Sequence, residues 1–201
     1  MRVNRKISFT IAAGALALVG ACGGSSDSMA GYKAMSQPTP TATMTGEQPS
    51  PTFNDADVMF AQMMILHHEQ AIEMAELASA QASDAEIKDL ASKIKESQEQ
   101  EIQTMEGWLS EWGKPTPSPG MGHEMPGAMS EEDMQKLESA QGKDFDRLFA
   151  KQMIAHHQGA IKMARMEEAG GANPQARELA KTIVTTQQEE VTQLRQILDR
   201  L

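Results

Sequence analysis

Apolar residues recur every three or four positions in four long segments of the chain, which is the spacing of one buried face of an α-helix. These segments predict helices over about residues 54–79, 83–112, 143–169 and 174–201. Their starts carry capping signals: Asn54 or Asp55, the capping box Ser83-Asp-Ala-Glu86, and the pair Asn173-Pro174. Ser130 can cap a further short helix that ends near Gly142. The chain lacks the alternation of β-branched and aromatic residues that is typical of strands, so the pattern predicts an all-α fold.

The second half of the chain repeats the first at a constant offset of 89 residues. Phe60 matches Phe149 and Ile94 matches Ile183, with no insertion between the matched helices. Each half, about 53–112 and about 130–201, is therefore predicted to be an αα-hairpin. Two hairpins packed face to face make a four-helix bundle over 53–201, joined by a Pro/Gly-rich linker over 113–129.

The N-terminal region has the pattern of a bacterial lipoprotein leader. A basic start and a short apolar run lead to Val19-Gly20-Ala21-Cys22, which is similar to the sequence at which a cysteine is lipidated. We expect residues 1–21 to be a signal peptide and Cys22 to carry the lipid. Residues 22–52, rich in Gly, Ser, Thr and Pro, are expected to be a disordered tether. This predicts a domain outside the cytoplasm, at the cell envelope, attached to the membrane through its N-terminal lipid.

Charge and composition narrow the possible partners. The formal net charge is -10, so nucleic acid is a poor partner. Methionine is the unusual residue, with 16 copies against an aromatic content of only 4%. We find no serine or cysteine nucleophile with a base and no Gly-rich phosphate loop, and therefore expect no enzymatic turnover.

Four of the five histidines lie in the repeated segment, as His67-His68 and His156-His157. At about 100° per residue, His67 falls about 20° from the centre of the core-facing arc and His68 about 80° from it. The same holds for the second copy, so we expect His67 and His156 to face the core and the other two to lie at its edge. Methionines flank both pairs, three residues before the first histidine and seven after it: Met64, Met74, Met153 and Met163.

Each partner helix places a carboxylate on its apolar face, Glu101 in the first half and Glu190 in the second. A buried carboxylate needs a partner, and the histidine of its own hairpin is the obvious one. We expect Glu101 and Glu190, with Gln98 and Gln187 one turn before them, to surround and orient the imidazoles rather than to bind metal. A buried Glu–His pair that only fixes helix packing is the simpler interpretation. The occurrence of the whole pattern twice favours a metal site.

The residue types favour copper. Di-iron bundles use Glu-x-x-His, whereas this chain has Met64-x-x-His67 and Met153-x-x-His156. Thioether sulfur is a soft ligand that selects Cu(I), and imidazole accepts either oxidation state of copper. The affinity is expected to fall as the pH drops through the histidine range, because the ligands must be deprotonated. The linker is a candidate for an auxiliary, accessible copper site, through Met121, His123, Met125 and Met129.

These residues resemble the bacterial family known as domain of unknown function 305, and within it the extracytoplasmic copper-binding proteins of CopM type. The similarity covers about residues 53–201, with both copies of Met-x-x-His-His-x-x-Ala-x-x-Met-Ala and both Gln-x-x-Glu segments. It implies a ferritin-like four-helix bundle that binds copper outside the cytoplasm. Carried over by position, the metal-binding motif falls on Met64, His67, His68, Met74, Met153, His156, His157 and Met163. One departure is Gln152, which stands where the first copy has Met63.

We therefore expect a lipid-anchored protein that sequesters copper, as Cu(I), or hands it to a copper-transfer protein. Two alternatives remain open at this point. One is a hard-metal bundle, an iron or zinc enzyme with His67, Glu101, His156 and Glu190 as ligands. The other is a metal-free interaction module in which the His–Glu pairs only specify packing.

Overall fold

The computed structural model describes residues 52–118 and 125–201, so the predicted signal peptide and tether lie outside the described residues. Five helices form: α1 (Asp55–Gln81), α2 (Ala85–Glu111), α3 (Glu131–Ser139), α4 (Gly142–Gly170) and α5 (Pro174–Arg200). The predicted all-α fold is confirmed, and the described part of the chain contains no β-strand. The four long helices begin and end within about two residues of their predicted bounds.

Side-chain caps fix where the helices begin. Asn54 accepts from the backbone N–H groups of Ala56 and Asp57, while the Asp57 carboxylate accepts from the N–H of Asn54. Asn173 caps α5 in the same way, with Pro174 at its first position. The predicted capping box at Ser83 is wrong by one residue, because Asp84 caps α2. The Ser83 hydroxyl instead donates to Asp146 on α4.

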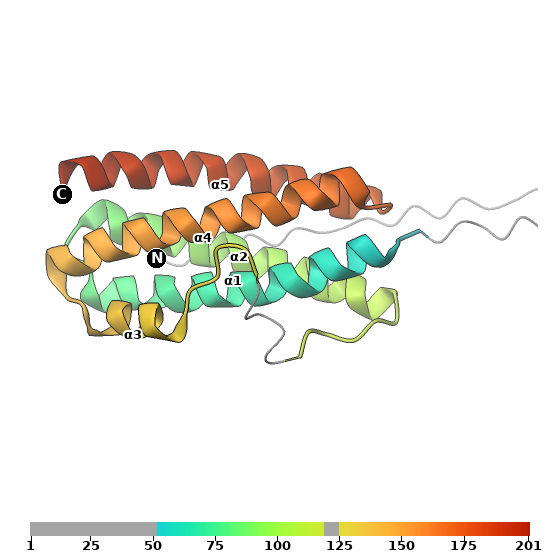
Figure 1. The fold of residues 1–201 in the computed structure, drawn as a ribbon, viewed down its shortest axis with the longest axis horizontal. Coiled ribbons are helices and arrows are strands. Elements are labelled where there is room, and N and C mark those ends of the chain that lie inside the picture. The colour runs from blue at the N-terminus through green and yellow to red at the C-terminus, as the bar shows by residue number, and fades with distance from the viewer. Residues whose placement is uncertain (1–51, 119–124) are drawn as a thin grey trace, which may run out of the picture. The chain divides into compact units, whose positions relative to one another are not determined.

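The long helices pair as two hairpins, α1 with α2 and α4 with α5, and the hairpins meet mainly through α1 and α4. In Figure 1, α1 and α4 run in opposite directions along the bundle, with α3 lying beside α1. The buried side chains form two clusters, one on each side of the bundle's middle. The repeated histidine segments occupy that middle.

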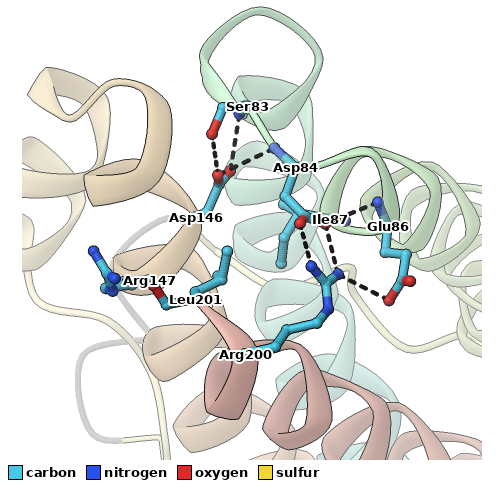
Figure 2. A network of polar contacts seen from close by, with 8 residues as sticks. All are labelled: Ser83, Asp84, Glu86, Ile87, Asp146, Arg147, Arg200 and Leu201. Atoms are coloured by element: carbon cyan, nitrogen blue, oxygen red, sulfur yellow. Dashed lines mark hydrogen bonds and ion pairs between the residues drawn. The ribbon is translucent and has the colours of Figure 1, made fainter.

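Matching aspartates tie the two hairpins together at opposite ends. Asp57 on α1 accepts from the backbone N–H groups of Ala172 and Asn173 in the α4–α5 turn. Its counterpart Asp146 on α4 accepts from the N–H groups of Ser83 and Asp84 in the α1–α2 turn. Figure 2 shows this second end, where Arg200 of α5 also pairs with Asp84 and Glu86. The pseudo-twofold symmetry predicted from the repeat is thus built into the contacts between the hairpins.

The segment before α3 crosses closely over α4. A Cβ at Gly159 would lie 1.8 Å from the carbonyl oxygen of Pro126, and Gly127 has a positive φ of 77°. Gln70 of α1 holds the same segment by donating to the carbonyl of Met129 and accepting from its N–H. These contacts press residues 125–129 onto the face formed by α1 and α4.

Candidate metal centre

The two histidine pairs meet where α1 crosses α4, in the middle of the bundle. All four histidines are fully buried, at 0% exposure. The rings of His67 and His156 lie with their centroids 3.7 Å apart and their planes at 40°. The prediction that these two face the core is confirmed. The expectation that His68 and His157 lie at its edge is wrong, because α2 and α5 cover them.

Three of the four imidazoles have an oxygen atom against Nε2. The carbonyl of Pro126 lies 3.0 Å from Nε2 of His67, and Glu101 Oε2 lies 2.6 Å from Nε2 of His68. Glu190 Oε2 lies 2.8 Å from Nε2 of His157, although this contact does not have the alignment of a hydrogen bond. A carbonyl or carboxylate oxygen can only accept, so His67 and His68 each donate a proton from Nε2 to these oxygens.

The four Nδ1 atoms share one property: each is buried and has no hydrogen-bond partner among the described residues. His156 has no such partner for either ring nitrogen. Buried polar atoms are normally paired, so four unpaired Nδ1 atoms in one layer need an explanation. Metal-binding histidines have this arrangement, with one nitrogen donating to an oxygen and the other free for the ion.

Each carboxylate lies against a histidine of its own hairpin, as predicted, and that histidine is the second of its pair. Glu101 and Glu190 contact His68 and His157, and not the core-facing His67 and His156. The physical reason is rotation about the helix: the second histidine of each pair points sideways, toward the partner helix of its own hairpin. Gln98 and Gln187, one turn away, are buried at 2% and 3% exposure with their Oε1 atoms unpaired among the described residues.

Burial keeps the central rings neutral. Desolvation, with repulsion from neighbouring His68, lowers the pKa of His67 to about 3. Desolvation also places the pKa of His156 well below its ordinary value, with nearby His67 adding to the effect. Both rings therefore keep a free lone pair at neutral pH. The expected loss of affinity in the ordinary histidine range is not supported for these two rings, whose protonation requires a lower pH.

The flanking methionines divide between the two core clusters. Met64 and Met163 lie in one cluster, and Met74 and Met153 lie in the other. At a rise of 1.5 Å per residue, Met64 and Met153 are about 4.5 Å along the axis from the first histidine of their pair. Met74 and Met163 are about 10.5 Å away on the same scale, which is two helical turns. All four are buried, with at most 8% exposure.

The predicted auxiliary site falls partly outside the described residues, since Met121 and His123 belong to 119–124. Met125 is buried in the core cluster of Met64, and Met129 packs against the other cluster. The expectation of an accessible site is therefore wrong for Met125, which is buried, and packing also accounts in part for Met129. The close approach at Gly159 draws their segment onto the bundle.

One contact of the centre was not predicted, namely the Pro126 carbonyl at His67. The sequence offers a hint, because Gly159 stands in the second copy where Gln70 stands in the first, and a glycine within a helix permits close approach of another backbone.

In the described ranges, no three His, Cys, Asp or Glu side chains form a group that could hold a metal ion. No described helix is long and apolar enough to cross a bilayer.

The fold and the site define an antiparallel helical bundle with a buried layer of paired histidines. The chain belongs to the family called domain of unknown function (DUF305), whose profile matches residues 57–198. The resemblance suggested by the two motifs is thereby confirmed. No curated protein sequence matches the chain significantly.

Solved structures of the same family resemble the bundle. A DUF305 fragment from Deinococcus radiodurans is 32% identical, with 74% of this chain and 98% of that chain covered and a TM-score of 0.68. A DUF305 protein from Streptomyces coelicolor that is predicted to be secreted is 31% identical, over 72% of this chain and 91% of that one, also with a TM-score of 0.68. CopM in its Cu(I)-bound form is 36% identical, with 72% of this chain and 96% of that chain covered and a TM-score of 0.63. CopM has also been solved with Cu(II) and with silver.

Proposed function

We propose that this protein binds copper in the histidine layer between α1 and α4, outside the cytoplasm, and sequesters or transfers it without turnover. The observation that carries the proposal is the set of four buried, unpaired Nδ1 atoms on two facing histidine pairs. Relatives support it, since CopM binds Cu(I), Cu(II) and silver.

The donor set favours the monovalent ion. Neutral imidazoles bring no charge into the core, and a single positive charge costs less to bury there than two. Met64 and Met153, one turn from the histidines, add soft thioether sulfur, which prefers Cu(I). Glu101 orients His68 by accepting the Nε2 proton, and Glu190 lies against Nε2 of His157, so that Nδ1 of each ring is left for the ion.

The setting is part of the same proposal. Lipidation at Cys22 would attach the protein to the membrane, and the tether over 22–52 would let the bundle reach a copper-transfer protein. The predicted secretion of the Streptomyces coelicolor relative agrees with a location outside the cytoplasm.

Metal-dependent thermal unfolding tests the proposal, because an ion that binds only the native state must raise its stability. We expect Cu(I), under anaerobic conditions, and Ag(I) to raise the Tm by several degrees, and Zn(II) and Fe(II) to raise it much less. A larger shift with zinc or iron would replace the proposal by a hard-metal site. A Tm that no metal changes would leave a bundle in which the His–Glu pairs serve packing alone.

A further inference from the structure

A second methionine-lined site lies on the surface, near the start of α1 and the end of α4. The cleft has a volume of about 300 Å³, and four of its lining residues are Met59, Met63, Met163 and Met166. Among the described residues, Met59 and Met166 are the large hydrophobic side chains left exposed, at 57% and 63%. Two long apolar side chains thus remain in water on facing walls of one cleft, which packing does not explain.

The repeat provides an internal comparison for this cleft. The positions equivalent to Met59, Met63 and Met166 are Leu148, Gln152 and Leu77. Leu77 and Leu148 pack against the core, and the Gln152 amide donates to the carbonyl of Asp133 in α3. One end of the bundle therefore uses this surface, built from both copies, to hold α3 and to pack aliphatic residues on the core. The other end, likewise built from both copies, has a thioether at each of the three positions and leaves two of them exposed.

Helix geometry places the four methionines of the cleft on two helix faces. Met59 and Met63 are four residues apart on α1, and Met163 and Met166 are three apart on α4, so each pair shares one helix face. Apart from Glu167, which is 2% exposed, the lining named for this cleft is apolar. A cluster of neutral, soft donors in an apolar cleft suits a monovalent soft cation and offers little to a divalent hard one.

We propose that this cleft is a second metal site, which binds Cu(I) or Ag(I) through the thioethers of Met59, Met63, Met163 and Met166. It needs no histidine, so it goes beyond the proposed histidine centre and does not depend on it. It nevertheless adjoins that centre, because Pro126 lines the cleft and its carbonyl oxygen contacts His67. The cleft also assigns a role to Met163, which lies about two helical turns along α4 from His156.

Silver titration of the intact protein carrying ¹³C-methyl methionine tests the proposal, with Ag(I) as a probe that does not change oxidation state. We expect the methyl signals of Met59 and Met166 to shift and saturate. The variant Met59→Leu with Met166→Leu should bind one silver ion fewer than the wild type. These substitutions conserve volume and introduce the residues of the equivalent positions, so the fold should tolerate them. Met134→Leu on α3 is the matched control and should keep the full number of ions.

The histidine variant His67→Leu with His156→Leu separates the two proposals. Silver-dependent shifts of Met59 and Met166 that persist in this variant support an independent cleft. Shifts that disappear with the histidines, or that never occur while the wild type still takes up silver, overturn the cleft site. The number and affinity of bound silver ions keep the two proposals distinct. The histidine centre fails only if the histidine variant binds as many silver ions as the wild type and binds them as tightly.

Discussion

The two halves of the bundle share their middle and differ at their ends. At the α1–α2 turn, Asp146 receives the N–H groups of Ser83 and Asp84 together with the Ser83 hydroxyl. At the α4–α5 turn, Asp57 receives the corresponding backbone N–H groups, but Ala172 stands where the other end has Ser83. Asp57 therefore lacks the hydroxyl donor that its counterpart Asp146 has.

Glu167 takes the place of that hydroxyl. Burial raises the pKa of Glu167 to about 8, with hydrogen bonding to Asp57 and repulsion by its charge adding to the effect. Burial alone would raise the pKa of Asp57, but hydrogen bonds from Glu167 and from backbone N–H groups outweigh it, so the pKa of Asp57 is lowered. The raised pKa of Glu167 and the lowered pKa of Asp57 place the proton of this carboxyl pair on Glu167. An ionised Glu167 would have no donor for either oxygen among the described residues.

The comparison shows where a duplicated bundle is free to change. His67, His68 and their counterparts all lie fully buried at equivalent positions, because both hairpins must supply one shared layer, although the Pro126 carbonyl contacts only His67. The ends belong to one hairpin turn each and can differ without disturbing the layer. At one end, the Ser83 hydroxyl contacts Asp146 and α3 covers the bundle. At the other end, Glu167 lies beside Asp57 and the methionine cleft is open.

Removing Asp146 should give the largest loss of stability. Asp146→Ala removes a buried carboxylate and leaves three partly buried donors of Ser83 and Asp84 without their acceptor, which should lower the free energy of unfolding by about 3 kcal/mol. Asp57→Ala should cost at least about 1 kcal/mol less, because Glu167 can ionise and accept from the freed N–H groups. Urea unfolding at pH 7 measures both. An equal loss in the two variants would mean that Glu167 does not substitute for the missing partner.

The crossing at Gly159 should respond to a single methyl group. Gly159→Ala would place Cβ 1.8 Å from the Pro126 oxygen, so residues 125–129 must move, at a cost of about 2 kcal/mol. Gln70→Ala, at the equivalent position of α1, removes two hydrogen bonds to Met129 and should cost about 1 kcal/mol. Thermal unfolding of both variants checks the order, and a neutral Gly159→Ala would show that the segment does not pack as described.

Glu101 and Glu190 should contribute unequally to the Cu(I) affinity. Glu101 makes an aligned hydrogen bond to His68, whereas the contact of Glu190 with His157 is not aligned. Glu101→Gln should therefore weaken Cu(I) affinity about tenfold, with a smaller effect for Glu190→Gln. Competition with a Cu(I) chelator measures both. Affinity unchanged in Glu101→Gln would remove the orienting role of this carboxylate.

The last prediction concerns the pH dependence of stability. The folded-state pKa of Glu167 is raised, so the folded protein binds the extra proton and stability falls as the pH rises from about 4.5 to about 8. Glu167→Gln should remove this part of the slope and exceed the wild type in stability above pH 8. Asp57 and Arg177 are the charged groups that act on Glu167, and neither changes in this variant. As a control at the other end, Ser83→Ala should lower stability equally across this pH range. If stability fell with rising pH as steeply in Glu167→Gln as in the wild type, the proton would not reside on Glu167.

Much of the fold was predictable from the sequence, because helix boundaries and the repeat are local or additive properties. The 3.6-residue period placed the four long helices, and the offset of 89 placed Phe60 and Phe149 in equivalent positions. The cap at Asp84 was missed because Ser83 satisfies the same pattern, and only the contact with Asp146 shows that its hydroxyl is used elsewhere.

The site was predictable to the level of residue type, and less so in its contacts. Helical angles put His67 and His156 in the core, but they do not tell how far the partner helix covers the next position, so His68 and His157 were misplaced. The pairing of Glu101 with His68 depends on side-chain direction, which spacing alone does not determine. The Pro126 carbonyl at His67 comes from a linker whose path follows from packing against Gly159.

The central claim is that the histidine layer binds Cu(I), and an anaerobic competition titration against a Cu(I) chelator tests it most directly. The comparison is between the wild type, His67→Leu with His156→Leu, and Met105→Leu as a control buried in the same cluster as Met64. We expect the histidine variant to bind Cu(I) at the layer at least about 100-fold more weakly, and the control to match the wild type. Equal affinity in the folded histidine variant and the wild type would contradict the account.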